Sequence, residues 1–179
     1  LSYMTMLKEA AKTDLELLLI QARIAEKLGS MPKAMELIRE AYRIDPKSSE
    51  VIVELAKIKS LQESDEFGLE IIEKALESNI VDDQLVLEKV SYLEKIRGKK
   101  RAADFLEGYL EKSENLHCVL QNWYADLIYQ LGNYEKSLQN YEKSAQLDDN
   151  QPLVHAMIGK LSMRKGNLDN AVFHLDKAI

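Results

Sequence analysis

Small residues recur along this chain at intervals of 34 or 35 positions, and this repeat constrains the fold more than any other feature. The clearest internal match pairs residues 132–137 (GNYEKS) with residues 166–171 (GNLDNA). Carried through the chain, the spacing aligns one column at Ala34, Gly68, Ala102, Ser137 and Ala171, a second at Ala22, Ala56, Val90, Ala125 and Gly159, and a third at Ala41, Ala75, Tyr109, Ser144 and Ala178. Three columns with one period indicate a chain built from repeated units.

The pattern inside each unit is helical. Sustained polar–apolar alternation and Asn-Gly or Asp-Gly hairpins are absent, which argues against strands. Gly29-Ser30, Gly132-Asn133 and Gly166-Asn167 each offer a helix-ending glycine followed by a capping side chain. Pro32 suits the first turn of a helix, and Asp45-Pro46 ends one before Ser48 or Ser49 caps the next. The predicted helices are 2–12, 15–28, 31–44, 49–62, 65–79, 83–97, 100–112, 117–131, 134–147, 152–165 and 168–179.

The small columns explain how these helices pack. Two helices approach closely only where a small side chain lets one cross over the other, and the first two columns supply such a position on each helix of a unit. Larger apolar residues fill the space beside the crossing, at Ile38, Ile72, Leu106, Tyr141 and Leu175. Each unit is therefore a helix A, a turn and a helix B. Because one pair cannot bury both of its faces, the units must stack.

On these residues the sequence resembles the tetratricopeptide repeat family, a 34-residue helix–turn–helix unit. That family has small residues at positions 8, 20 and 27 and proline at 32, where the first unit has Ala22, Ala34, Ala41 and Pro46. The third unit departs from the pattern at Val90 and Tyr109. The resemblance implies an all-α, right-handed superhelical solenoid that forms a single domain over residues 1–179. Its repeats would be 15–48, 49–82, 83–117, 118–151 and a truncated 152–179, with 1–14 as a helix of a preceding repeat.

Composition excludes several other classes of protein. With 46% apolar residues in 179, the chain is ordered, and no apolar stretch approaches the ~20 residues of a membrane span. One cysteine rules out an internal disulfide framework, favours the cytoplasm and is also compatible with a bacterial periplasm or cell surface. The formal net charge of −6 argues against a general nucleic-acid binder.

The sequence offers no catalytic or cofactor-binding motif. His117, His155 and His174 lack metal-ligand spacing, and the chain has no phosphate-binding glycine loop and no Gly-x-Ser-x-Gly. The many carboxylates are typical of helix caps and solvated helix faces. We therefore predict that the chain is not an enzyme and that it has no cofactor and no metal.

The resemblance implies a binding groove on the concave face, formed by the A helices. An apolar row beside a partly basic row there would suit an extended or helical peptide. The candidate groove residues are Leu19, Arg23, Val53, Lys57, Leu87, Ser91, Asn122, Trp123, Asp126, Tyr129 and Lys160. Leu19, Val53, Leu87 and Trp123 have an alternative interpretation as packing residues between neighbouring helices. The Lys and Asn pattern with which chaperone-binding members hold a C-terminal carboxylate is absent, because no run of three units here matches it.

One basic cluster stands apart from this groove. Lys95, Arg97, Lys99, Lys100 and Arg101 fall at the turn between the two helices of the third unit. The last three crowd a helix start, where the dipole disfavours cations by ~0.3–1 kcal/mol each. This cluster is a candidate patch for an anion or an acidic partner, although a solvated turn explains it equally simply and is the interpretation we favour.

These observations predict a non-catalytic scaffold that binds a peptide or protein partner in its concave groove. The chain starts at Leu1 and stops at Ile179 inside a helical pattern, so we interpret it as a piece of a longer protein. One alternative is therefore the repeat domain of a larger enzyme, such as a glycosyltransferase, or of a signalling protein. Another is a self-assembly module that forms homo-oligomers through its solenoid ends.

Overall fold

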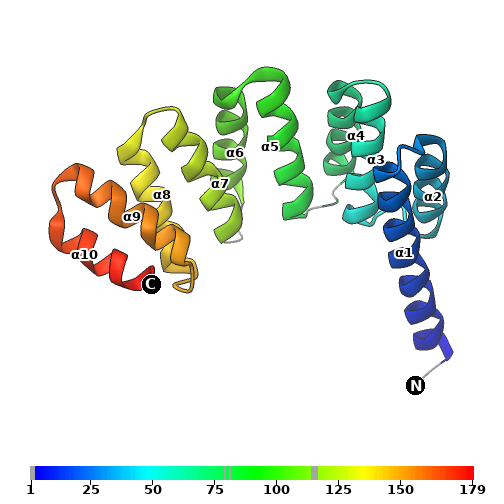
Figure 1. Ribbon diagram of the computed structural model, residues 1–179, viewed down its shortest axis with the longest axis horizontal. Coiled ribbons are helices and arrows are strands. Elements are labelled where there is room, and N and C mark those ends of the chain that lie inside the picture. Colours follow the sequence, from blue (N-terminus) through cyan, green and yellow to red (C-terminus); the bar gives the residue numbers. More distant parts are fainter. Residues whose placement is uncertain (1–2, 79, 81, 114–116) are drawn as a thin grey trace. The chain divides into compact units, whose positions relative to one another are not determined.

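The computed structural model describes residues 3–78, 80, 82–113 and 117–179, with side chains from Asp14 onward. Over these residues the chain forms ten α-helices and no β-strand, which confirms the predicted all-α fold (Figure 1). The helices are α1 (Tyr3–Lys27), α2 (Met31–Ile44), α3 (Ser49–Gln62), α4 (Asp65–Glu77), α5 (Asp83–Arg97), α6 (Lys99–Lys112), α7 (Cys118–Gln130), α8 (Tyr134–Leu147), α9 (Pro152–Lys165) and α10 (Leu168–Lys177).

Helix α1 differs from the sequence expectation. Separate helices were predicted over 2–12 and 15–28, but the structure has one continuous helix of 25 residues from Tyr3 to Lys27. The intervening Thr13 and Asp14 are good capping residues, yet neither a glycine nor a proline lies beside them. Without a residue that breaks the backbone pattern, the helix continues through them.

The turns between paired helices follow the predicted punctuation. Gly132 has a positive φ of 83°, which glycine adopts without strain, and Asn133 N–H donates to the carbonyl of Ile128 at 3.1 Å. The Asn133 side chain then caps α8 by accepting from Lys136 N–H at 3.2 Å. Asn167 caps α10 in the same way, from Asn170 N–H.

The start of α2 departs from this scheme. Ser30 was predicted to cap α2, but its side chain makes no capping hydrogen bond there. Pro32 does lie in the first turn of α2, where a missing N–H costs nothing. Before α3, Ser48 accepts from Val51 N–H at 3.4 Å, so Ser48 is the cap and Ser49 is the first helical residue.

The helices group into two compact units, which we describe separately. Residues up to Tyr92 form the first unit, and residues from Leu93 onward form the second. In the first unit, α1 packs on α2, α2 on α3 and α3 on α4. In the second unit, α6 packs on α7, α7 on α8, α8 on α9 and α9 on α10. Within each unit the chain is thus a stack of helical hairpins.

The small columns lie at the helix crossings as the packing argument requires. Ala34, Ala41 and Ala56 are fully buried in the first unit, and Ala125 and Ser137 are fully buried in the second. Ser137 also donates from its hydroxyl to the Ala125 carbonyl at 2.9 Å, so the polar atom is satisfied inside the core. Large apolar side chains then fill the layers around these crossings.

Candidate interaction surface

The apolar row predicted for the groove is inaccessible in the first unit. Leu19 of α1 and Val53 of α3 are each 1% exposed, so neither side chain can contact a partner. These two residues were included in the candidate groove, and the structure corrects this: they pack between neighbouring helices. Leu87 and Ser91 of α5 are half-buried.

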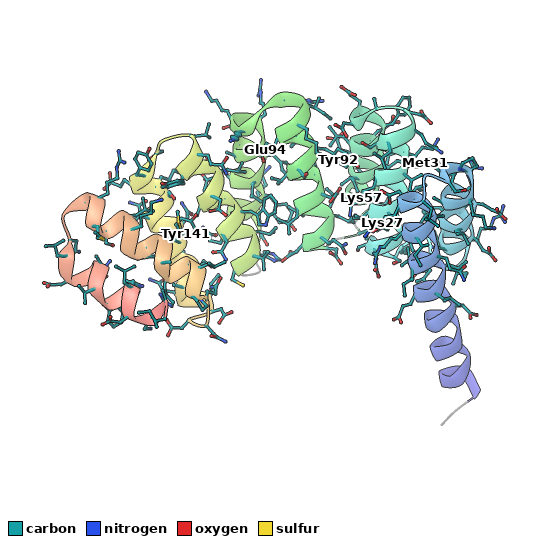
Figure 2. The ribbon with its side chains drawn as sticks, in the orientation of Figure 1. Lys27, Met31, Lys57, Tyr92, Glu94 and Tyr141 are labelled. Atoms are coloured by element: carbon teal, nitrogen blue, oxygen red, sulfur yellow. The ribbon has the colours of Figure 1, made fainter. Side chains whose placement is uncertain are left out.

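The basic row of the first unit is paired with carboxylates of α3. Arg23 donates through Nε to Glu54 Oε1 and through Nη2 to Glu50 Oε1, both at 2.9 Å. Lys57 Nζ lies 3.8 Å from the same Glu54 oxygen (Lys57 is labelled in Figure 2). Burial acts to lower the pKa of Arg23, but the hydrogen bonds to Glu50 and Glu54 outweigh it and raise this pKa. Two cations face two carboxylates, so this row is close to electrically neutral.

In the second unit, α7 presents an accessible face. Trp123 is 40% exposed, and Asp126 is exposed and accepts a hydrogen bond from the hydroxyl of Tyr141 (labelled in Figure 2). Tyr129 is half-buried and meets the ring of Tyr134 edge-on, with 5.3 Å between ring centroids. Because Trp123, Asp126 and Tyr129 follow one another at three-residue intervals, they lie on one side of the helix.

Cations from α9 cover these rings. Lys160 Nζ lies 5.1 Å from the centroid of the Tyr129 ring, and the Arg164 guanidinium lies 3.8 Å from the centroid of Tyr134. Both cationic side chains are exposed. We call the surface formed by Trp123, Asp126, Tyr129, Tyr134, Lys160 and Arg164 the α7–α9 face.

Asn122 is also on α7 but serves the packing of the two hairpins. Its Nδ2 donates to Gln151 Oε1 at 2.6 Å, immediately before α9 begins. Gln151 in turn donates to the carbonyl of Ser144 at 3.1 Å. Asn122 is half-buried and therefore links repeats more than it lines an open surface.

Three residues of these surfaces escaped the sequence prediction. Tyr134 and Arg164 belong to the α7–α9 face, and Glu54 neutralises the predicted basic row. The sequence could have identified Arg164, because it lies one helical turn after the candidate groove residue Lys160 on the same A helix. Tyr134 starts a B helix, and only the folded turn brings its ring next to Tyr129.

The basic cluster lies where the sequence placed it, around the turn from α5 to α6. Lys95 and Arg97 end α5, and Lys99, Lys100 and Arg101 form the first turn of α6. All five are exposed, and the first turn of α6 holds no acidic residue. Gly98, with φ of 84°, precedes α6 without a side-chain cap. This exposure agrees with both interpretations, and the anion patch stays a prediction.

Among the described residues, no group of three or more His, Cys, Asp and Glu side chains could hold a metal ion. In the same part of the chain, none of the helices combines the length and apolar character needed to cross a membrane.

Comparison with known proteins identifies the repeat. The tetratricopeptide repeat model matches residues 15–48, which are the bounds of the first predicted repeat, and residues 120–151 within the fourth. No curated protein matches the chain.

Solved structures share the fold at low sequence identity. PilF of Pseudomonas aeruginosa is 18% identical with a TM-score of 0.68, covering 94% of this chain and 77% of its own. MamA is 18% identical with a TM-score of 0.63, covering 88% and 91%. YrrB is 19% identical with a TM-score of 0.56, covering 99% and 91%. Residues 15–48 and 120–151 therefore match tetratricopeptide repeats, and the stacked hairpins of the chain share the fold of these solved structures.

Proposed function

We propose that this protein is a non-catalytic interaction scaffold and that the α7–α9 face binds a peptide segment of a partner protein. The observation that carries the proposal is the exposed Trp123, with Tyr129 on the same side of α7 and cations of α9 above that ring. Exposed tryptophan, tyrosine and arginine are the residues that dominate interface energies. The tetratricopeptide fold generally mediates protein–protein interaction, and YrrB is described as having an unusual peptide-binding site.

The charges on this face suggest the chemistry of the partner segment. Lys160 and Arg164 lie over aromatic rings, which leaves their outward N–H groups free to meet carboxylates. Asp126 is the single acidic member and already accepts the Tyr141 hydroxyl. The face is therefore net basic on a chain whose formal charge is −6. A segment with an apolar anchor for Trp123 and acidic residues for Lys160 and Arg164 fits it.

The first unit contributes less to this proposal. Arg23 and Lys57 are balanced by Glu50 and Glu54, so an acidic partner would have to displace existing ion pairs. We therefore place the binding surface on the second unit.

A selection from a random peptide library against the whole chain tests this proposal. Selected peptides should lose at least about tenfold in affinity with Trp123→Ala, and a similar factor with Lys160→Glu plus Arg164→Glu. Lys143→Glu is the matched control, because Lys143 is an exposed lysine of α8 outside the α7–α9 face. If every selected peptide binds the Trp123→Ala and charge-reversed variants as tightly as the original chain, the assignment of this face is wrong.

A second candidate function, self-association, rests on helix faces that lack a neighbour in this structure. Leu17 and Ile24 of α1 are 52% and 53% exposed, whereas their equivalents one repeat later, Val51 and Ile58, are 0% and 1% exposed. At the other end, Val172 of α10 is 59% exposed, and its equivalents Leu69 and Leu138 are buried. In the interior repeats, a neighbouring repeat covers these positions.

A second copy of the chain could supply the missing neighbours. One molecule carries an uncovered A-helix face and an uncovered B-helix face, the two kinds of face that pack together in α2–α3 and α8–α9. Such a contact is head-to-tail, so it would extend to oligomers larger than a dimer. Sedimentation at increasing concentration should show growing species, and Ile24→Glu should abolish them. A monomer at all concentrations would contradict self-association while leaving the peptide proposal intact.

A further inference from the structure

Three repeats share one side-chain pairing, at the end of the hairpin where the chain enters the repeat. In each of these three, the fourth residue of helix A pairs with the residue 19 positions later, in helix B of the same repeat, and we call this place a junction. These pairs are Ile52 with Ile71, Gln121 with Asn140 and His155 with His174. The first pair is apolar and the other two are polar.

At the two polar junctions, the paired side chains hydrogen-bond to each other. Gln121 Nε2 donates to Asn140 Oδ1, and Asn140 Nδ2 donates to the carbonyl of Lys136 at 2.6 Å. At the last junction the Nδ1 atoms of His155 and His174 are 2.8 Å apart, and His155 Nε2 donates to the carbonyl of Asp149 at 2.9 Å. These hydrogen bonds join the paired side chains to each other and to the backbone.

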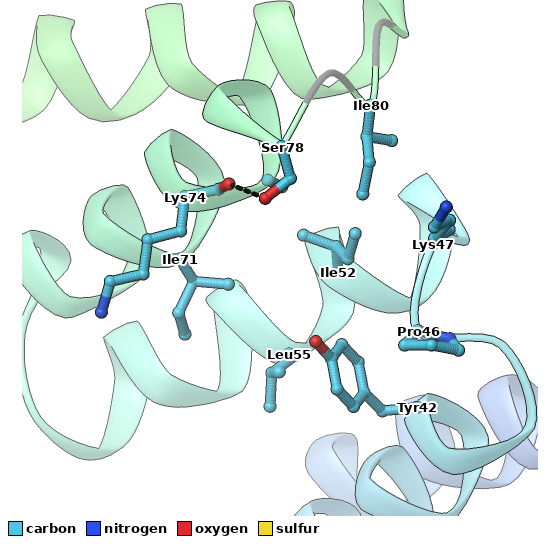
Figure 3. Close-up of a pocket in the computed structure, with 10 residues that line it drawn as sticks. Tyr42, Pro46, Lys47, Ile52, Leu55, Ile71, Lys74, Ser78 and Ile80 are labelled. Atoms are coloured by element: carbon cyan, nitrogen blue, oxygen red, sulfur yellow. Dashed lines mark hydrogen bonds between the residues drawn. The ribbon is translucent and has the colours of Figure 1, made fainter.

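The first junction instead opens into an apolar cavity of about 500 Å³ (Figure 3). The cavity is lined by one residue of α2, two of α3, three of α4 and four of the turns that follow α2 and α4: Tyr42, Ile52, Leu55, Ile71, Lys74, Ala75, Pro46, Lys47, Ser78 and Ile80. Ile52 is buried at the floor, while Tyr42 is 41% exposed at the rim. A cavity of this size and apolar lining is typical of ligand sites and offers a water few hydrogen-bond partners.

Two lysines lie at opposite ends of this cavity in Figure 3, Lys74 beside Ile71 and Lys47 beside Pro46. Among the described residues no carboxylate pairs with Lys47 Nζ. Lys74 Nζ pairs with Glu70 at 2.5 Å, one turn earlier on α4, but both side chains are exposed. Exposed pairs of this kind contribute little to stability, so a ligand carboxylate can replace Glu70 at little cost.

We infer that this cavity is a second binding site, for a peptide that inserts a large apolar side chain and directs flanking acidic residues to Lys47 and Lys74. The cations at both ends of the cavity favour such a peptide over a single-headed amphiphile, because the amphiphile has one carboxylate for two lysines. This site belongs to the first unit and the α7–α9 face belongs to the second, so the inference does not depend on that face.

The test uses peptides selected from a random library against the whole chain and sorted by two variants. Peptides for this cavity should share an apolar residue flanked by Asp or Glu. They should lose at least about tenfold in affinity with Ile71→Glu and with Lys47→Glu plus Lys74→Glu, and keep it with Trp123→Ala. Lys143→Glu is the matched control, because Lys143 is the equivalent of Lys74 in the fourth repeat.

Because Ile71→Glu could disturb folding, its circular dichroism and melting are compared with the original chain. The charge reversal, confined to exposed side chains, carries the inference if Ile71→Glu unfolds. The inference is wrong if no selected peptide loses affinity with Lys47→Glu plus Lys74→Glu. It is also wrong if no such peptide is found and the chain instead binds dodecanoate in a way that Ile71→Glu abolishes. The second result would make the cavity a lipid site.

Discussion

His155 and His174 face each other between α9 and α10 with their Nδ1 atoms 2.8 Å apart. His155 Nε2 also lies 2.9 Å from the backbone carbonyl of Asp149. Because a carbonyl oxygen can only accept a hydrogen bond, Nε2 of His155 carries the hydrogen. A neutral His155 then accepts at Nδ1 from His174. Protonating both rings would direct two N–H groups at each other, so the pair holds at most one extra proton without losing this bond.

This relationship predicts that stability falls on mild acidification. Burial, then the neighbouring His155 and Lys177, lower the pKa of His174 below its ordinary value of 6.5, and Asp149 opposes this only in part. Between the folded and the unfolded pKa, the unfolded chain therefore binds more protons than the folded one. The free energy of unfolding should decrease as pH falls through about 6.5 and stay level above it. Urea titrations across this range measure the change.

The first unit supplies the control for this prediction. Ile52 and Ile71 hold the equivalent positions without a titratable group, so His155→Ile plus His174→Ile reproduces an arrangement that the chain already uses. The double variant should lose the pH dependence between about 5.5 and 7.5. An undiminished dependence in that variant would assign it to other groups.

Two helical glycines should respond oppositely to alanine. A Cβ at Gly68 would lie 2.6 Å from the buried ring of Tyr92, whereas a Cβ at Gly108 meets nothing within 4 Å. Gly108→Ala should therefore stabilise the protein by about 0.5–1 kcal/mol through helix propensity. Gly68→Ala should destabilise it by about 1–3 kcal/mol despite the same gain. Chemical denaturation of the two variants gives the comparison, and stabilisation by Gly68→Ala would refute the close approach of Tyr92.

The Arg23–Glu54 pair should show coupling in a double-mutant cycle. Glu54 is 6% exposed, so Arg23→Met leaves a buried carboxylate with only the more distant Lys57 and should cost about 1–2 kcal/mol. Adding Glu54→Leu removes that carboxylate, and stability should recover to near its original value. Glu50→Gln, which alters the exposed partner of Arg23, should cost less than about 0.5 kcal/mol. Additive single-variant effects would mean that the pair contributes nothing specific.

A bulky side chain at a helix crossing tests the repeat register. Ala171 is 1% exposed at the position where Ala34 is fully buried in the first repeat. Ala171→Phe should destabilise the chain by about 1–3 kcal/mol, because the crossing has no room for a ring. Phe at the exposed Asp169 of the same helix is the control, and equal melting temperatures for the two variants would contradict the register.

Much of the fold could be predicted from the sequence, because each repeat packs chiefly on its neighbours in the chain. Columns such as Ala22, Ala34 and Ala41 specify where helices cross, and glycine turns such as Gly132-Asn133 specify where they end. The candidate surface could be predicted only in part. Position within a repeat could not distinguish the buried Glu54 from the exposed Trp123, which are both the sixth residue of a repeat, since burial depends on which side chains the neighbouring helices contribute.

The sequence by itself determined the all-α repeat, because a small residue recurring every 34 positions has one efficient use, close helix crossings between identical units. Only the tertiary structure decided which side chains of those units remain available. It paired Arg23 with Glu54, joined His155 to His174, and left the equivalent Ile52 and Ile71 around an open cavity. The physical reason is distance: these partners are separated by 19 to 31 residues, and side-chain contact at that separation exists only once the helices have packed.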